Sequence, residues 1–269
     1  MKVSISGISF TKSKNLENLN KTIEFIVEQM NVNEININSQ IIRYQGEKPF
    51  VLFDFKRHDK IRRKFGRIMF NVLNPELKYN IRHQISELRA ITFKRGHYKG
   101  RSGKIYGWKQ LNLTSKHIFL WQTFLESDDD LLFVLEDDAM LNPINKVAIP
   151  DLCFFTAKIS PDPVFINLIN HFDLRSNSIE TDMPLLGENS YYSKTLANTT
   201  GAYVINREMA IALYEAILMN PEFRVVGADW LIGLLTQQFA SESNPVCLNI
   251  VPGIFTNGSL DSNTSSLEN

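Results

Sequence analysis

Residues 131–138, LLFVLEDD, constrain the fold more than any other stretch of the chain. The five consecutive apolar residues 131–135 predict a buried strand. Glu136, Asp137 and Asp138 follow it without a spacer, and three adjacent carboxylates repel one another. A sequence that places this repulsion at the end of a buried strand is expected to bring a positive partner to the same place.

The first fifty-five residues predict the start of an α/β domain. Residues 2–10 carry β-branched residues in alternation and predict a first strand. Asn15 is placed to cap a helix whose apolar residues recur at helical spacing as far as Met30. Residues 39–44 and 50–55 predict two further strands. Strand, helix and strand in this order favour a mostly parallel sheet.

The second half continues the same mixture of elements. Residues 114–124 have a helical pattern ahead of the strand 131–135. Residues 164–168 and 202–205 predict strands, and residues 206–219 predict an amphipathic helix. We therefore expect an α/β fold in which helices flank a mostly parallel central sheet.

Composition limits the class of protein. The chain has 269 residues, 43% of them hydrophobic and 22% charged, which excludes wholesale disorder. No run reaches the roughly 18 apolar residues of a membrane span, and the first residues lack the apolar core of a signal peptide. Cys153 and Cys247 form neither a zinc-binding spacing nor a disulfide framework and are expected to be packing residues. We expect a cytoplasmic protein.

The net charge of zero hides a strong asymmetry along the chain. Residues 56–104 hold 15 Lys and Arg against 3 Asp and Glu, whereas residues 105–269 hold 8 against 20. The basic segment 56–104 fits a solvated helix face with a loop. It equally fits contact with nucleotide phosphates or with the anionic inner face of a membrane. No nucleic-acid-binding motif accompanies the charge, so nucleic acid is not an expected partner.

The acidic triplet predicts a site for a divalent cation. In open α/β sheets ligands bind beside the carboxyl ends of strands, and Mg²⁺ or Mn²⁺ prefers carboxylate oxygens. On an extended segment residues i and i+2 point the same way, so Glu136 and Asp138 are expected to share a cation while Asp137 faces away. The alternative is an ordinary strand end. Residues 128–130, three further aspartates after a helix, are expected to form a solvated turn.

Four segments in order resemble glycosyltransferase family 25, the group of lipooligosaccharide and collagen galactosyltransferases. They are His117 with Trp121 and Gln122, LLFVLEDD at 131–138, TTGAYVINREMA at 199–210, and GADWL at 227–231. The resemblance covers about residues 107–260. Lys116 stands where this family usually has a serine.

The resemblance implies a GT-A-like single domain over residues 1–260, with the basic region 56–104 as an insertion or subregion. It implies an inverting, divalent-metal-dependent transferase that moves a hexose, with galactose favoured, from a nucleotide sugar, with a UDP-sugar favoured. The implied acceptor is a bacterial surface glycan or a lipid-linked oligosaccharide. Residues 261–269 are polar and are expected to be a disordered tail.

Site residues follow from the matched segments. Mn²⁺ or Mg²⁺ would be held by Glu136 and Asp138. Asp229 is the first candidate for the base that takes the acceptor proton, with a helix N-cap as the alternative. His117 is the candidate that orients a phosphate or the acceptor, with a structural histidine as the alternative. The expected donor contacts are Asn198, Thr199, Thr200 and Gly201. Residues 250–262, IVPGIFTNGSLDS, resemble the closing segment of the family, which adds Asn257 and Ser259 to the expected donor contacts.

Two functions of other classes stay open at this point. A non-enzymatic module on a degenerate transferase fold would bind polyanions or anionic membrane through residues 56–104. A metal-dependent phosphohydrolase would use the same carboxylates, but such enzymes usually assemble more ligands than the five scattered histidines of this chain offer.

Overall fold

The computed structural model describes residues 1–10, 13–44, 108–144, 148–159, 161–169, 179–180, 190–193, 200–219, 228, 231–233, 235 and 245–258. The expected strand at 50–55, the basic segment 56–104 and the tail 261–269 lie outside these residues. The bounds of the predicted domain, 1–260, therefore stay a prediction.

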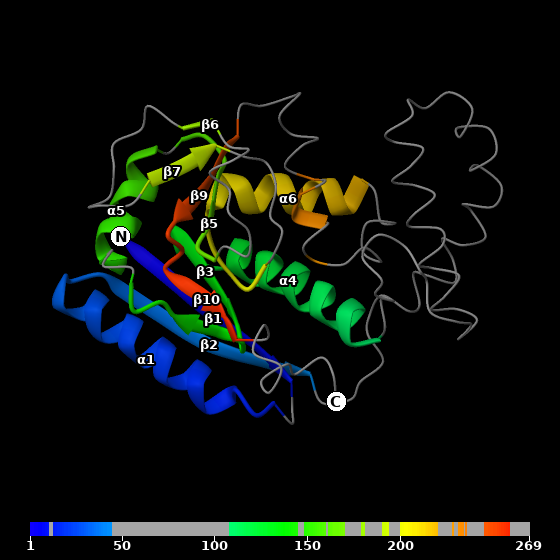
Figure 1. Ribbon diagram of the computed structural model, residues 1–269. Helices are drawn as coiled ribbons and strands as arrows, with labels where there is room; N and C mark the ends of the chain where they lie inside the picture. The colour runs from blue at the N-terminus through cyan, green and yellow to red at the C-terminus, as the bar shows by residue number, and fades with distance from the viewer. Residues whose placement is uncertain are drawn as a thin grey trace.

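Helices and strands alternate along the described chain, as Figure 1 shows. The helices are α1 (Leu16–Val32), α4 (Trp108–Glu126), α5 (Ile149–Ile159) and α6 (Arg207–Met219). The strands are β1 (Lys2–Phe10), β2 (Asn36–Tyr44), β3 (Leu131–Glu136), β4 (Ala139–Leu141), β5 (Val164–Asn167), β6 (Ile179–Glu180), β7 (Ser190–Ser193), β8 (Ala202–Asn206), β9 (Val246–Val251) and β10 (Phe255–Asn257).

Eight of the described strands form one sheet in the order β2-β1-β3-β8-β5-β9-β7-β6. Strands β2, β1 and β3 are parallel, and β5 is parallel to β9. Strand β8 lies between β3 and β5 and is antiparallel to both, so β3 and β5 run in the same direction. Within the six strands from β2 to β9 only β8 is reversed. The prediction of an α/β fold with a mostly parallel central sheet flanked by helices is confirmed.

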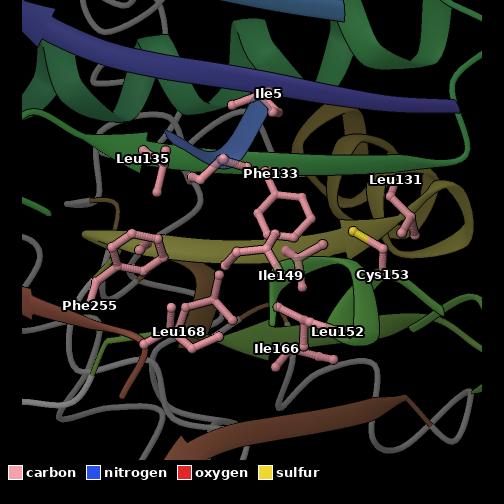
Figure 2. Close-up of a cluster of buried hydrophobic side chains, with 14 of the residues drawn as sticks. Ile5, Leu131, Phe133, Leu135, Ile149, Leu152, Cys153, Ile166, Leu168 and Phe255 are labelled. Atoms are coloured by element: carbon pink, nitrogen blue, oxygen red, sulfur yellow. The ribbon is translucent and has the colours of Figure 1, made fainter. Parts of the chain in front are cut away.

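Helices cover both faces of this sheet (Figure 1). On one face α1 and α5 bury a cluster that includes Ile5, Phe133 and Ile166, drawn in Figure 2. On the other face α4 and α6 bury Trp121, Val134 and further apolar residues. Alternate residues of β3 thus enter the two clusters, which explains why residues 131–135 are all apolar.

Helix α1 packs unusually close to β1 because of one glycine. A Cβ atom on Gly7 would lie 3.0 Å from side-chain carbons of both Leu19 and Ile23. Helix α1 begins directly after Asn15, as predicted, but the Asn15 side chain makes no capping hydrogen bond. Packing of Leu19, Ile23 and Ile26 against the sheet therefore replaces the expected cap in holding this helix.

Both cysteines are buried, as expected for packing residues. Burial raises the pKa of the Cys153 and Cys247 thiols to about 12. No described helix is long and apolar enough to cross a membrane.

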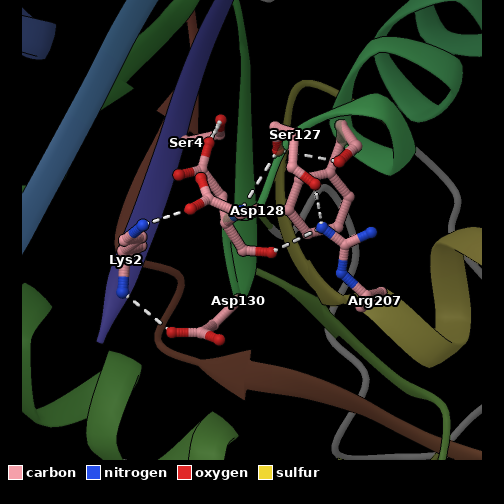
Figure 3. Close-up of polar contacts among 8 residues, drawn as sticks. Lys2, Ser4, Ser127, Asp128, Asp130 and Arg207 are labelled. Carbon is pink, nitrogen blue, oxygen red and sulfur yellow. Dashed lines mark hydrogen bonds and ion pairs between the residues drawn. The ribbon is translucent and has the colours of Figure 1, made fainter.

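The turn between α4 and β3 differs from its prediction. Asp128 and Asp130 are exposed, but Asp129 is only 6% exposed and accepts a hydrogen bond from the Ser4 hydroxyl at 2.5 Å. The main chain of Lys2 donates to the Asp130 carboxylate at 2.8 Å, and its ammonium group pairs with Asp128 (Figure 3). These aspartates fasten the start of β1 to the turn, so the expectation of a solvated turn is wrong for Asp129.

Arg207, the first residue of α6, binds the same turn from the other side (Figure 3). Its guanidinium donates to the carbonyl oxygens of Leu125, Ser127 and Asp129, and it lies over the Phe124 ring at 5.4 Å. These carbonyls come at and just after the end of α4, where carbonyl groups lack partners within the helix. Arg207 is thus a C-terminal cap supplied by another helix.

Replacing Arg207 by methionine should lower the free energy of unfolding by about 2 kcal/mol, because several carbonyls lose a charged donor. Arg207→Lys keeps the charge without the planar fork and should recover only part of this loss. Urea denaturation of the three proteins measures the effect. Equal stability of all three would contradict the capping role.

Candidate functional site

The candidate site lies where β3 ends and β8 begins. Glu136 is the last residue of β3, and its main-chain N–H donates to the Gly201 carbonyl at 2.8 Å. Because β8 is antiparallel to β3, residues 200 and 201 reach the same edge of the sheet as Glu136. This is the carboxyl edge of the parallel strands, where open α/β sheets bind ligands.

The Glu136 carboxylate is held by two side chains from different elements. Its Oε1 accepts a hydrogen bond from the Thr200 hydroxyl at 2.5 Å and lies 3.2 Å from Nε2 of His117. The Glu136 side chain is 16% exposed. Burial raises its pKa to about 7, with a further rise from Asp137, while the Thr200 hydrogen bond and the charge of Lys116 act against the rise.

His117 is fully buried and joins Glu136 to the core. Its Nδ1 lies 2.9 Å from the Tyr203 hydroxyl, which also accepts a hydrogen bond from Trp121 Nε1 at 3.0 Å. All these groups are satisfied when Tyr203 donates to Nδ1 and the protonated Nε2 donates to Glu136. Burial, opposed by the Trp121 hydrogen bond, raises the pKa of Tyr203, so its hydroxyl stays protonated. The network runs from Trp121 through Tyr203 and His117 to Glu136.

Asp137 is fastened to the neighbouring strand. It is 4% exposed, and its Oδ2 accepts a hydrogen bond from the Ser9 hydroxyl at 3.1 Å. The carbonyl of Ser9 accepts a hydrogen bond from Nζ of Lys116 at 2.6 Å. Ser9 therefore connects the acidic turn to helix α4.

Asp138 lies against the C-terminal segment of the described chain. Its carbonyl accepts a hydrogen bond from the Gly258 N–H at 2.8 Å, and Asn257 pairs with Ala139 where β10 meets β4. A Cβ atom at Gly258 would lie 2.8 Å from the Met140 sulfur and 3.2 Å from the Asp138 carbonyl. Only glycine fits this approach without a shift, and it brings Asn257, an expected donor contact, next to the acidic turn.

Several predicted site residues therefore come together in one place. Glu136, His117, Thr200 and Gly201 meet directly, and Asp138 meets the segment that contains Asn257. The remaining predicted residues lie outside the described chain: Asp229, Asn198, Thr199 and Ser259.

Glu136 and Asp138 were expected to point to one side and Asp137 to the other, and this expectation holds only in part. Strand β3 ends at Glu136, and Asp137 and Asp138 form the turn into β4. The rule that residues i and i+2 share a side applies to extended strands and does not extend through this turn. Glu136 and Asp137 do turn to different partners, Thr200 with His117 and Ser9 respectively.

Sequence reasoning missed three parts of this network. Tyr203, Ser9 and Lys116 were not among the expected site residues. His117 and Trp121 are four residues apart on a helix, a spacing that places them on one face. That spacing was a signal that both residues could share a partner such as Tyr203.

The donor types at this edge fit a hard divalent cation. The carboxylates of Glu136 and Asp138 are two residues apart, the first at the end of β3 and the second in the turn that follows. Among the described residues no three His, Cys, Asp or Glu side chains gather around one point. Mg²⁺ and Mn²⁺ suit such a site because they commonly bind one or two carboxylates together with water and substrate phosphates.

Comparison with known proteins adds little. No protein-family profile matches the chain, and no curated protein sequence matches it. Among solved structures it is similar to a glycosyltransferase involved in the glycosylation of the major capsid of PBCV-1. The two share 11% sequence identity with a TM-score of 0.29, over 81% of this chain and 68% of that chain. A likeness at this level does not bear on the chemistry, which depends on the residues described above.

Proposed function

We propose that the protein is a glycosyltransferase that moves a hexose from a nucleotide sugar to a glycan. A UDP-hexose, with galactose favoured, is the proposed donor, and a bacterial surface glycan or lipid-linked oligosaccharide is the proposed acceptor. The observation that carries the proposal is the contact of His117 and Thr200 with Glu136 at the end of β3.

These contacts join three of the four segments that resemble glycosyltransferase family 25. His117 and Trp121 come from the first segment, Glu136 from the second, and Thr200 and Tyr203 from the third. Strand pairing places β8 beside β3, and polar side chains of α4 and of the segment before β8 converge on the Glu136 carboxylate there. Their meeting at the ligand-binding edge of the sheet supports a common site.

The carboxylates of Glu136 and Asp138 would hold the divalent metal of this site. When bound, the metal would supply positive charge that stabilises the departing diphosphate. His117 and Thr200 fix the orientation of the Glu136 carboxylate by donating to Oε1. The buried Trp121 donates to the Tyr203 hydroxyl, and this hydroxyl fixes the ring of His117. Buried side chains therefore hold the Glu136 carboxylate in one orientation before any ligand binds.

The proposed reaction is one direct displacement. The acceptor hydroxyl oxygen bonds to the anomeric carbon, the bond from that carbon to the diphosphate oxygen breaks, and the nucleotide leaves with the electron pair. Asp229 is the proposed base that takes the acceptor proton. Attack from the face opposite the leaving group inverts the anomeric configuration.

A panel of UDP-, GDP- and CMP-sugars tests the proposed activity, with and without Mn²⁺. We expect release of one nucleotide, UDP, that requires Mn²⁺ and rises when a glycan acceptor is added. NMR of the product should show the inverted anomer. Release that does not rise when acceptor is added would indicate a hydrolase, and no release from any donor in the presence of acceptor would contradict the proposal.

Contact with an anionic membrane through residues 56–104 remains a prediction, because these residues lie outside the described chain. A salt titration of binding to anionic vesicles tests it. Association dominated by phosphates should weaken steeply as ionic strength rises. An enzyme with a lipid-linked acceptor would gain from such contact, so this property is compatible with the proposed transfer.

A further inference from the structure

One buried cation beside the acidic turn has no part in the proposed transfer. Lys116 is 0% exposed and is among the largest fully buried side chains of the described chain. Its Nζ donates to the Ser9 carbonyl at 2.6 Å, and the Ser9 hydroxyl donates to Asp137 at 3.1 Å. Ser9 thus bridges the ammonium group and the acidic turn.

A buried ammonium group is costly unless other groups compensate its charge. Burial lowers the pKa of Lys116 to about 8, and the negative charges of Asp137 and Glu136 act against this fall. Since this value is still above 7, Lys116 remains mainly charged at neutral pH. The compensation comes from the acidic turn, so cation and turn stabilise each other.

We propose that Lys116 is the built-in countercharge of residues 136–138 and that it limits how tightly this turn binds a divalent cation. Asp137 faces this cation, because its carboxylate accepts the hydroxyl of the same Ser9 whose carbonyl accepts the Lys116 ammonium. A fixed positive charge at this place repels an incoming cation and weakens its binding. The second half of this inference rests on the proposed function.

Mn²⁺ binding tests the second half. Free Mn²⁺ is titrated by electron paramagnetic resonance in the presence of UDP, with the wild type, Lys116→Met and Asp137→Asn. Removing the positive charge of Lys116 should tighten Mn²⁺ binding by about five- to tenfold. Removing the negative charge of Asp137 should weaken Mn²⁺ binding by a similar factor. A purely structural role of Lys116 would weaken binding in Lys116→Met. Unchanged or weaker binding in the folded variant would therefore overturn this half.

Unfolding of the same variants tests the first half without any metal. Lys116→Met should destabilise the protein strongly because the carboxylates lose their countercharge, and Asp137→Asn should do so because the buried ammonium loses a partner. The double variant should be more stable than Lys116→Met alone. If the loss of stability in the double variant equals the sum of the two single losses, Lys116 and Asp137 do not stabilise each other and the pairing is overturned. This holds even if Lys116→Met barely folds, because without the pairing the double variant would fold no better than Lys116→Met.

The two readouts separate this inference from the proposed function. No Mn²⁺ binding by the wild type would contradict the metal site and the limit that Lys116 sets on it. The double-mutant cycle would still decide whether Lys116 is the countercharge of the turn.

Discussion

Replacing Asp138 by asparagine is expected to lower the rate of nucleotide release by about a thousandfold. The change removes one of the two carboxylates that would hold the metal. A metal contributes several kcal/mol to stabilising a departing diphosphate, and each 1.36 kcal/mol changes the rate tenfold. The rate is measured as UDP released from the preferred donor at saturating Mn²⁺.

The matched control for this variant is Asp162→Asn. Asp162 is an exposed aspartate before β5, and within the described residues its main-chain carbonyl, not its side chain, accepts a hydrogen bond, from Asn206. We expect normal activity from this control and an unchanged free energy of unfolding. Activity of Asp138→Asn within threefold of the wild type would remove Asp138 from the proposed metal site.

Replacing Tyr203 by phenylalanine should lower the free energy of unfolding by about 2–3 kcal/mol, because two buried groups lose a hydrogen-bond partner at once. The indole N–H of Trp121 would have no acceptor, and Nδ1 of His117 would lose the hydroxyl at 2.9 Å. The rate of catalysis should fall as well, because the His117 ring, which orients Glu136, loses its hydrogen bond to the Tyr203 hydroxyl. Urea denaturation and the rate of UDP release measure the two effects.

Tyr214→Phe is the matched control for Tyr203→Phe. Tyr214 lies on α6 and is partly buried against the same apolar cluster, and within the described residues its hydroxyl has no hydrogen bond. Loss of this hydroxyl should change the free energy of unfolding by no more than about 0.5 kcal/mol. Equal losses in the two variants would show that the Tyr203 hydroxyl does no more than fill space.

The buried strand of the site was predictable because its pattern is local. Five apolar residues followed by three acids place β3 and its carboxyl end within one residue of the observed strand, which ends at Glu136. The strand at 2–10 and the helix predicted at 206–219 follow from similarly local patterns. The observed helix starts one residue later, at Arg207, because the Asn206 side chain accepts the N–H of Met209 and caps α6. Such patterns need no knowledge of the partner segments.

The support around the carboxylates was not predictable because it depends on pairing between distant segments. Ser9 meets Asp137 only because β1 lies beside β3 in parallel register, with Ile8 opposite Glu136. Tyr203 meets His117 only because β8 is inserted antiparallel next to β3. In the sequence Lys116 looked like a departure from a serine, and its burial beside the acidic turn appears only in the folded chain.

The same dependence explains the error at Asp129. A run of three aspartates after a helix is typical of a solvated turn, and two of the three are indeed exposed. Asp129 is buried because β1 brings the Ser4 hydroxyl to 2.5 Å from its carboxylate. A single sequence does not show which carboxylate of such a run will face a neighbouring strand.

In the proposed function the acidic turn at the end of β3 binds a cation, and this cation binds the diphosphate of a nucleotide. Pulsed electron paramagnetic resonance of Mn²⁺ with UDP tests it most directly, through the magnetic coupling between the metal and the phosphorus nuclei. We predict that this coupling appears with the wild type and disappears with Asp138→Asn. Protein-bound Mn²⁺ without phosphorus coupling, or coupling that survives in Asp138→Asn, would contradict the claim.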